Sequence, residues 1–416
     1  MANLNGVDMQ KGLVGMNALT GSDGVSGIII GSPAAPQLAL NIVEELYNID
    51  DVEAKGITAQ FDLDNNVNVY RHLSEFYRMA GRGQKLFLIL VDATATMVDI
   101  LEDVDVKSAK KLLIEAKGGI KQIGVAANIA GAITSLNSIP DDVFAAIPKA
   151  QGLANWAFEN NFPCQVLLEG YSFSGDAASS QDLRAIENLL APKVSVVIGQ
   201  DWDYADTLPA GNQQKLADVG TALGTLSACT IAQNIGDNEA FNLTDAIAEA
   251  WLEPGLSSHQ KNDEVFAGLQ TLENKGYIFG VTYTGIAGVR WNNDHTCTEI
   301  VIDAQGKINE HTIAYGRTHD KAIRLLYAAL IPKVKTKQPV DPKTGKLPIG
   351  VVRNFEGIGD DVLNDMLNRK EISGGKTTVD PDSDLIVAKL LKTNFRIVPY
   401  GNINTIEGTS NLKSKL

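Results

Sequence analysis

Residues 292–334 concentrate side chains that could bind a metal ion or transfer protons. The segment holds Cys297, several carboxylates and three of the five histidines, His295, His311 and His319. Zinc sites built on histidine use recurrent spacings, such as His-Glu-x-x-His, which place two ligands on one face of a helix. The three histidines match no such spacing. We therefore expect neither a metal ion nor a cofactor in this segment.

Two glycine-containing stretches also invite a ligand-binding interpretation. The sequence SGGKTT at 373–378 could form a phosphate-binding turn, but a P-loop requires glycine five positions before Gly375, where Lys370 stands. The sequence GIIIGSP at 27–33 lacks the dinucleotide-binding fingerprint. No Gly-x-Ser-x-Gly motif occurs, and Ser195 lies in an apolar run typical of a strand. None of these stretches nominates a catalytic group.

A third candidate site consists of acids that follow apolar runs. Asp92 follows one such run, and Asp201 and Asp203 follow another in the sequence VIGQDWDYADT. In open α/β sheets, ligands bind at the carboxyl ends of the strands, so these acids could serve an enzyme. No nucleophile, base or ligand set accompanies them. We therefore expect a protein that is not an enzyme, and keep an α/β enzyme as an alternative.

The composition restricts the partners and the compartment. A net charge of −14 disfavours nucleic acid, because phosphate binding needs a concentrated basic surface. The N-terminal sequence has no secretory pattern, and no window is long and apolar enough to cross a bilayer. The cysteines form no Cys-x-x-Cys pair, which fits a reducing compartment. We expect no nucleic acid, no membrane insertion and assembly in the bacterial cytoplasm.

Apolar runs that alternate with helical patterns predict an α/β fold. Buried strands are expected at 86–91, 120–129, 163–171 and 194–202, with helices at 141–162 and 181–193 between the later ones. This alternation predicts a three-layer α/β domain over residues 25–268, with a mostly parallel sheet. In residues 215–236, small side chains predict a helix packed close to a neighbour. β-Branched and aromatic residues then increase, so a smaller α+β domain is expected over 269–394.

The segment from 298 to 334 predicts a β-hairpin followed by a basic helix. Gln305-Gly306 lies between two alternating runs, so residues 304–307 are expected to form the turn, with His311 in the second strand. Thr318 is a usable N-cap for a helix that Pro332 ends. Its apolar face is expected to pack on the domain. Its basic residues and those that follow are expected to point outward: Lys321, Arg324, Lys333, Lys335 and Lys337.

Five features in chain order connect the last 140 residues to a known family. They are Asn293-Asp294 before the hairpin, the basic helix of Arg317, Lys321 and Arg324, a linker at 341–347, the helix GDDVLNDMLNRKEISGG and a final strand at 397–406. In this order they resemble the C-terminal domain of contractile tail sheath proteins, which occur in phage tails, R-type bacteriocins and related injection systems. The resemblance implies a structural subunit that polymerises as a helical array around an inner tube and contracts to drive the tube outward.

The resemblance also implies that extended arms are exchanged between subunits. The N-terminal arm would comprise residues 1–24, with Met9, Leu13, Val14 and Leu19 as its apolar side chains. The C-terminal arm would comprise residues 395–416, with Phe395, Arg396, Ile397 and Val398 as the exchanged strand. Strands at chain ends can complete a neighbour's sheet through main-chain hydrogen bonds.

The implied partners are other copies of the chain, the inner tube protein, and baseplate and terminator proteins. Sheath subunits hold their tube partly through charge, so the five basic residues from Lys321 to Lys337 are expected to contact it. The resemblance places the finished particle among phage tails or tail-like particles. Another self-assembling shell subunit remains an alternative, because polymerisation alone does not distinguish a helical tube from a closed particle.

Overall fold

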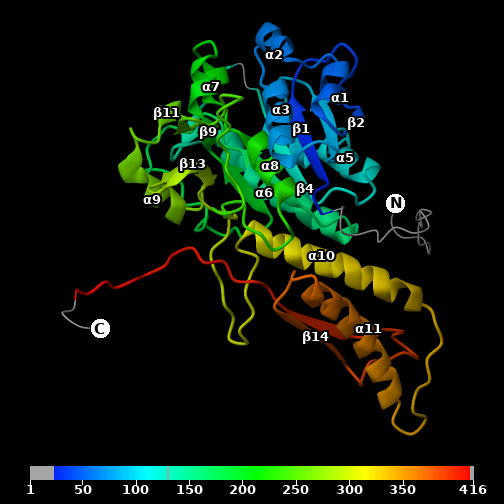
Figure 1. The fold of residues 1–416 in the computed structure, drawn as a ribbon. Coiled ribbons are helices and arrows are strands. Elements are labelled where there is room, and N and C mark those ends of the chain that lie inside the picture. Colours follow the sequence, from blue (N-terminus) through cyan, green and yellow to red (C-terminus); the bar gives the residue numbers. More distant parts are fainter. Residues whose placement is uncertain (1–22, 129–130, 413–416) are drawn as a thin grey trace.

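The computed structural model describes residues 23–128 and 131–412, which form a large first unit and a smaller C-terminal unit (Figure 1). The first unit is built on a six-stranded sheet in which every neighbouring pair is parallel except β2 with β3. Its strand order is β2 (Val43–Leu46), β3 (Leu86–Val91), β1 (Ser26–Gly31), β4 (Gln122–Ala126), β7 (Gln165–Glu169) and β8 (Val194–Val197). The parallel strands are almost wholly apolar because both faces of the sheet are covered.

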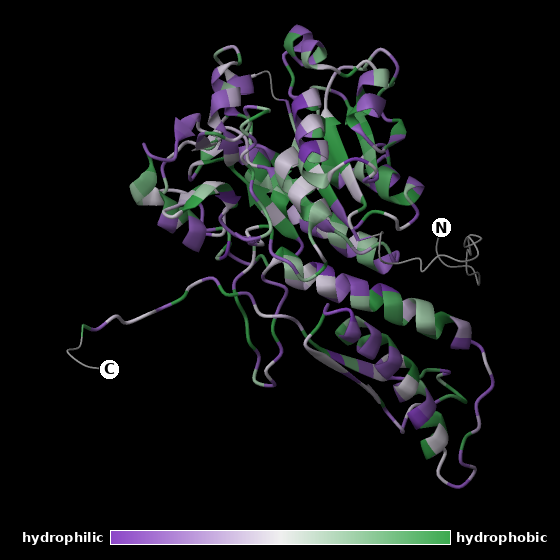
Figure 2. Cartoon of the chain, in the orientation of Figure 1, coloured by the Kyte–Doolittle hydropathy of each residue, from purple (hydrophilic) through white to green (hydrophobic). Residues whose placement is uncertain are grey.

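Alternate side chains of the strands define two cores, one on each face of the sheet. Ile29 of β1 belongs to one core, and Ile28 and Ile30 belong to the other. The Ile29 face is covered by α4 (Met97–Glu102), α5 (Ala109–Glu115) and α6 (Asp141–Glu159). The opposite face is covered by α3 (Val69–Ala80) and α8 (Val219–Ala228). The predicted three-layer α/β architecture is confirmed, and the apolar colouring of the sheet follows it (Figure 2).

Small residues bring α8 against α3, as the sequence predicted. A Cβ added to Gly220 would lie 2.2 Å from the carbonyl oxygen of His72, and one added to Gly224 would lie 2.5 Å from that of Phe76. Any side chain at these two glycines would therefore push the helices apart.

Shorter elements complete the first unit. They are α1 (Ile49–Ala54), α2 (Ala59–Asn65), β5 (Ser135–Leu136), β6 (Ile139–Pro140), β9 (Gly199–Asp201), α7 (Trp202–Asp206), the 3-10 helix η1 (Asn212–Lys215), β10 (Pro254–Leu256), β11 (Gln260–Lys261), α9 (Phe266–Asn274), β12 (Gly280–Tyr283) and β13 (Ile286–Trp291).

Residues 269–297 pack in the first unit, whereas the sequence placed the domain boundary at 268/269. Leu272 and Tyr277 belong to the core on the α6 face, and Val289 and Trp291 belong to the core on the α8 face. The change in composition after residue 276 therefore marks a change of secondary structure inside one unit.

The helix expected at 181–193 is absent from this described segment, which forms turns instead. Its backbone groups bond to other segments: Leu183 N donates to the carbonyl oxygen of Lys275 at 3.0 Å, and Ala191 N to that of Cys297 at 3.1 Å. The carboxylate of Asp182 accepts from Arg184 N at 2.9 Å, which stabilises a turn. Tertiary hydrogen bonds have replaced the helical ladder here.

The predicted hairpin is reduced to a turn, and the basic helix begins earlier than expected. Asp303 N donates to Lys307 O at 2.9 Å, and Ile302 pairs with Ile308 as an isolated bridge. The helix is α10 (Ile313–Leu330), whose N-cap is Thr312 rather than Thr318. His311 therefore precedes the helix instead of lying within a strand.

The C-terminal unit lies on the far side of α10 from the sheet (Figure 1). It contains the 3-10 helix η2 (Ile331–Lys333), α11 (Ile349–Asn368), β14 (Gly374–Val379) and β15 (Thr393–Val398). The two strands pair antiparallel from Gly374–Val398 to Val379–Thr393. The chain then extends away from both units through residue 412. The expected smaller α+β unit is therefore present. None of the helices described is both long and apolar enough to cross a membrane.

Candidate functional site

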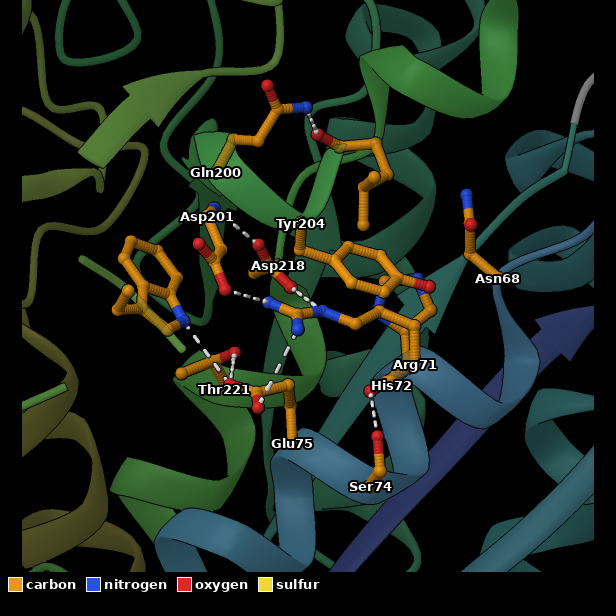
Figure 3. Close-up of polar contacts among 12 residues, drawn as sticks. Asn68, Arg71, His72, Ser74, Glu75, Gln200, Asp201, Tyr204, Asp218 and Thr221 are labelled. Atoms are coloured by element: carbon orange, nitrogen blue, oxygen red, sulfur yellow. Dashed lines mark hydrogen bonds and ion pairs between the residues drawn. The ribbon is translucent and has the colours of Figure 1, made fainter. Parts of the chain in front are cut away.

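The acids at the strand ends form a buried ion cluster around Arg71 (Figure 3). Arg71 Nη2 lies 3.0 Å from Asp201 Oδ2, and Arg71 Nε lies 2.8 Å from Asp218 Oδ1. On the same helix, Arg71 Nη1 lies 3.7 Å from Glu75 Oε1. The Tyr204 ring covers the guanidinium, with its centroid 4.0 Å from Cζ. The cluster joins α3 to β9, α7 and the start of α8.

Opposing effects set the charges of this cluster. Burial alone would lower the pKa of Arg71, but the carboxylates of Asp218, Glu75 and Asp201 raise it well above its ordinary value. Burial raises the pKa of Asp218 to about 6, although Arg71 acts against that shift. Glu75 is also buried, but Arg71 and Arg78 lower its pKa to about 2. Arg71 is therefore held as a cation whose charge balances the acids around it.

The three acids suggested as an enzyme site have separate structural partners. Asp201 pairs with Arg71, and Asp203 accepts a hydrogen bond from Glu253 N at 3.0 Å. Asp92 is exposed and accepts from Thr94 N at 2.8 Å. A cleft of about 720 Å³ opens beside the Arg71 cluster, and its lining includes Arg78, Asp203, Tyr204, Glu249 and Leu252. The structure thus places Asp201 and Asp203 near one another but uses both to hold the fold.

The three histidines of the 292–334 segment are not gathered at one point. His295 is buried between Arg184 and Glu273, with Nδ1 2.6 Å from Arg184 Nη2 and Nε2 2.8 Å from Glu273 Oε1. Since arginine only donates, Nδ1 accepts and the proton on Nε2 is donated to the carboxylate. His311 packs edge-on against Tyr315, and His319 contacts Glu310. Across residues 23–128 and 131–412, no group of three His, Cys, Asp or Glu side chains could hold a metal ion.

The Asn293-Asp294 pair caps the N-terminus of α10. Asp294 Oδ2 accepts from Ala314 N at 2.8 Å, and its carbonyl oxygen accepts from Ile313 N at 2.9 Å. Asn234 Nδ2 bonds both Asn293 Oδ1, at 2.7 Å, and Asp294 Oδ1, at 2.8 Å. The first turn of a helix leaves such N–H groups without partners in the helix itself, so the pair fixes where α10 starts on the first unit.

Lys321 and Arg324 do not point outward, so that expectation is wrong. Lys321 is 2% exposed; it contacts Asp23, and its Nζ lies 2.6 Å from Glu371 Oε1. Arg324 Nη1 donates to the carbonyl oxygen of Pro163 at 2.8 Å. The reason is that α10 lies between the two units (Figure 1), so Lys321 meets Glu371 of the C-terminal unit and Arg324 meets Pro163 of the first unit. The exposed basic residues follow the helix: Lys333, Lys335 and Lys337.

The expected exchange strand pairs within its own chain. Phe395–Val398 is part of β15 and bonds to β14, with Phe395 and Ile397 half-buried and Arg396 and Val398 exposed. In the part of the chain that the structure describes, no further strand joins this two-stranded sheet, and the outer edge of β15 is open. The outer edge of β14 is partly covered by α11, because Thr377 N and Val379 N donate to the carboxylates of Asp360 and Glu356 at 2.7 and 3.3 Å. The apolar arm residues Met9, Leu13, Val14 and Leu19 lie outside the described residues.

An extended tail follows the open sheet. Residues 399–412 contain large apolar side chains that are exposed: Tyr400, Ile403, Ile406 and Leu412. Exposed apolar side chains on an extended segment favour association. The C-terminal unit therefore presents both an open sheet edge and an extended strand-forming segment.

Comparison with known proteins relates the whole chain to one family and one fold. The family described as DUF2586 matches twice, through its N-terminal domain at residues 6–295 and its C-terminal domain at residues 311–416. A comparison with curated protein sequences gave no match.

Three solved structures share the fold along nearly the full length. A chain of the anti-feeding prophage helical sheath in its contracted state is 11% identical, with 99% of each chain covered and a TM-score of 0.60. A chain of the anti-feeding prophage baseplate is 12% identical, with 99% of this chain and 100% of the other covered and a TM-score of 0.60. A chain of the PVC sheath complex in its contracted state, from an extracellular contractile injection system, is 9% identical. The match covers 100% of this chain and 99% of the other, with a TM-score of 0.50.

Proposed function

The chain belongs to the DUF2586 family, and we propose that it is the sheath subunit of a contractile tail or injection system. Copies would polymerise as a helical array around an inner tube and contract to drive the tube outward. The observation that carries this proposal is a shared fold over 99% of the chain with a protein of a contracted helical sheath. The role is structural rather than enzymatic. The partners of the three candidate acids support this, because Asp201 pairs with Arg71, and Asp203 and Asp92 accept from backbone N–H groups.

Exchange of chain ends would connect the copies. The tail at 399–412 of one copy would add as a strand to the open edge of β15 in the next, where main-chain hydrogen bonds supply affinity. This replaces the narrower expectation that Phe395–Val398 is itself donated, because that strand already pairs with β14. Residues 1–22 would form a second exchanged arm, shorter than the expected 1–24 because Arg317 and Ser227 hold Asp23 and Gly24 within their own chain.

Removal of residues 399–416 tests the exchange. The truncated chain keeps β15, so we expect a folded subunit that stays monomeric by sedimentation while the full chain polymerises. A matched control removes only residues 413–416 and should polymerise normally. Polymers of ordinary length from the chain that ends at Val398 would contradict the exchange.

The basic residues after α10 are the candidate tube contact. Lys333, Lys335 and Lys337 are exposed and close in sequence, which suits an acidic tube surface. Contacts between exposed charges are individually weak and screened by salt, as a grip that must be released requires. Baseplate and terminator proteins would bind the ends of the array, and assembly would take place in the bacterial cytoplasm.

A further inference from the structure

Lys321 occupies the meeting point of three distant segments. It projects from the middle of α10, and its side chain contacts the carboxylates of Asp23 and Glu371. Asp23 lies three residues before β1, and Glu371 lies between α11 and β14. One buried ammonium group thus joins the end of the N-terminal segment, the helix between the units and the C-terminal unit.

The backbone around Asp23 is also held tightly. Arg317, one turn before Lys321 on α10, donates from Nη2 to the carbonyl oxygen of Asp23 at 3.1 Å. The hydroxyl of Ser227 donates to the carbonyl oxygen of Gly24 at 2.5 Å. No larger residue fits in place of Gly24, since an added Cβ would lie 2.4 Å from the carbonyl oxygen of Ser227. The chain therefore enters the first unit through a fixed, closely packed point.

Stability alone gives a poor reason for burying these charges. Burial of an ion pair costs solvation that its Coulomb attraction often fails to recover, and apolar residues of similar size commonly serve as well. What a buried pair does supply is a defined geometry, because only one arrangement satisfies both charges. Here that arrangement fixes the entry point of the chain relative to α10 and to the C-terminal unit.

We propose that Lys321 is a positioning residue. It links residues 23–30, which lead into β1 and form most of that strand, to the C-terminal unit, so that these two parts of the chain move as one body. The assembly role of this tie rests on the proposed function: a neighbour that held the N-terminal segment would pull on α10 and the C-terminal unit together. Without Lys321, the same pull would still reach α10 through Arg317, but the link to Glu371 and the C-terminal unit would be lost.

Hydrogen exchange of the full-length chain tests whether Lys321 holds residues 23–30 in place. The variants are Lys321→Met, and a triple variant that combines it with Asp23→Asn and Glu371→Gln. The triple variant leaves none of these three groups charged, so it should fold even if Lys321→Met alone does not. We expect amides of residues 23–30 to exchange at least tenfold faster in the triple variant. Exchange at the wild-type rate would overturn the proposal.

The control is Lys346→Met, which removes an exposed ion pair with Asp382 in the same C-terminal unit. Exchange at 23–30 should not change in this variant, and an equal acceleration would overturn the specific role of Lys321. Because hydrogen exchange needs no polymer, it decides the proposal even if the wild-type chain fails to polymerise. That failure would count against the proposed function instead.

A distance measurement tests the movement of the two units, which a purely local packing role would not alter. Spin labels at Ile247→Cys in the first unit and Ile349→Cys in the C-terminal unit occupy sites that are 98% and 70% exposed. We expect one narrow distance distribution in the otherwise wild-type chain and a distribution at least twofold wider in the triple variant. Equal widths would overturn the claim that the units move as one body.

Discussion

The two units on either side of α10 differ in how much of their apolar surface they bury and how many of their strand edges they pair within one chain. In the first unit, a six-stranded sheet is covered on both faces, and Asp201 and Asp218 at its edge pair with Arg71. In the C-terminal unit, the buried apolar residues form clusters of five and four, and the two-stranded sheet has an open edge at β15 within the described chain. The first unit therefore buries both faces of its sheet by itself, whereas the sheet of the C-terminal unit could gain a strand from a neighbouring copy.

Replacement of Arg71 should produce the largest loss of stability, because Arg71 is the cation that pairs with buried carboxylates in the first unit. Arg71→Met would leave Asp201 and Asp218 buried without their cation, which should lower the free energy of unfolding by about 3–5 kcal/mol. Urea unfolding measures this change. Arg82→Met removes an exposed pair with Asp50 and should cost under about 1 kcal/mol. Equal costs for the two variants would show that the cluster does not stabilise the unit.

Leu363→Ala should weaken only the C-terminal unit. Leu363 of α11 is buried in one apolar cluster with Met366 and Ile372. Replacement of a buried leucine by alanine lowers the free energy of unfolding by about 2–5 kcal/mol. Because this unit has little other core, we expect β14 and β15 to lose their hydrogen-exchange protection while the six-stranded sheet keeps its own. Leu367→Ala, at an exposed position one turn on, is the control. Equal loss of protection in both units would mean that they unfold together.

The stability of the first unit should also depend on pH through Glu169. Its carboxylate is buried and accepts from Ala127 N and Ala217 N, each at 3.1 Å. Burial raises the pKa of Glu169 from 4.5 to about 8. Between these two values the folded chain keeps a proton that the unfolded chain has lost, so this contribution falls as pH rises from 4.5 to 8.

The variant Glu169→Gln isolates that contribution. The unfolding free energy of the wild type minus that of the variant should fall by about 1.4 kcal/mol per pH unit across this window, measured by urea unfolding at several pH values. Other buried groups titrate equally in both chains and cancel. A difference that stays constant from pH 4.5 to 8 would show that Glu169 ionises normally.

The smallest effect on stability is expected from the exposed basic residues after α10. Replacement of Lys333, Lys335 and Lys337 by glutamate should change the unfolding free energy by under about 0.5 kcal/mol. The same variant should lose the salt-sensitive part of its co-sedimentation with the inner tube protein. Arg353→Glu, at an exposed site on α11, is the control. Unchanged tube binding would remove these lysines from the contact.

The sequence was informative where structure depends on local pattern. Apolar runs such as 86–91 predicted the parallel sheet, and the small residues of α8 predicted a close helix contact. The order of features after Asn293 predicted a sheath-like chain, and the structural matches have that fold. These features come from strand periodicity, helix composition and motif order, which are all visible along the chain.

The remaining features depend on contacts between distant residues. Arg71 and Glu75 are four positions apart on one helix, but Asp201 and Asp218 follow more than a hundred residues later, so no spacing indicated the cluster. Lys321 was expected outside because helical periodicity does not reveal that a second unit covers the polar side. Residues 181–193 have helical composition, but their backbone bonds to residues near 275 and 297 instead.

Negative-stain electron microscopy of the purified full-length protein tests the central claim most directly. The sheath proposal predicts long hollow cylinders with oblique surface striations, which the chain that ends at Val398 should fail to form. Closed particles would contradict it and favour a shell subunit. Uniform small globules that persist when the inner tube protein is added would also contradict it, and would direct attention to the cleft beside Arg71.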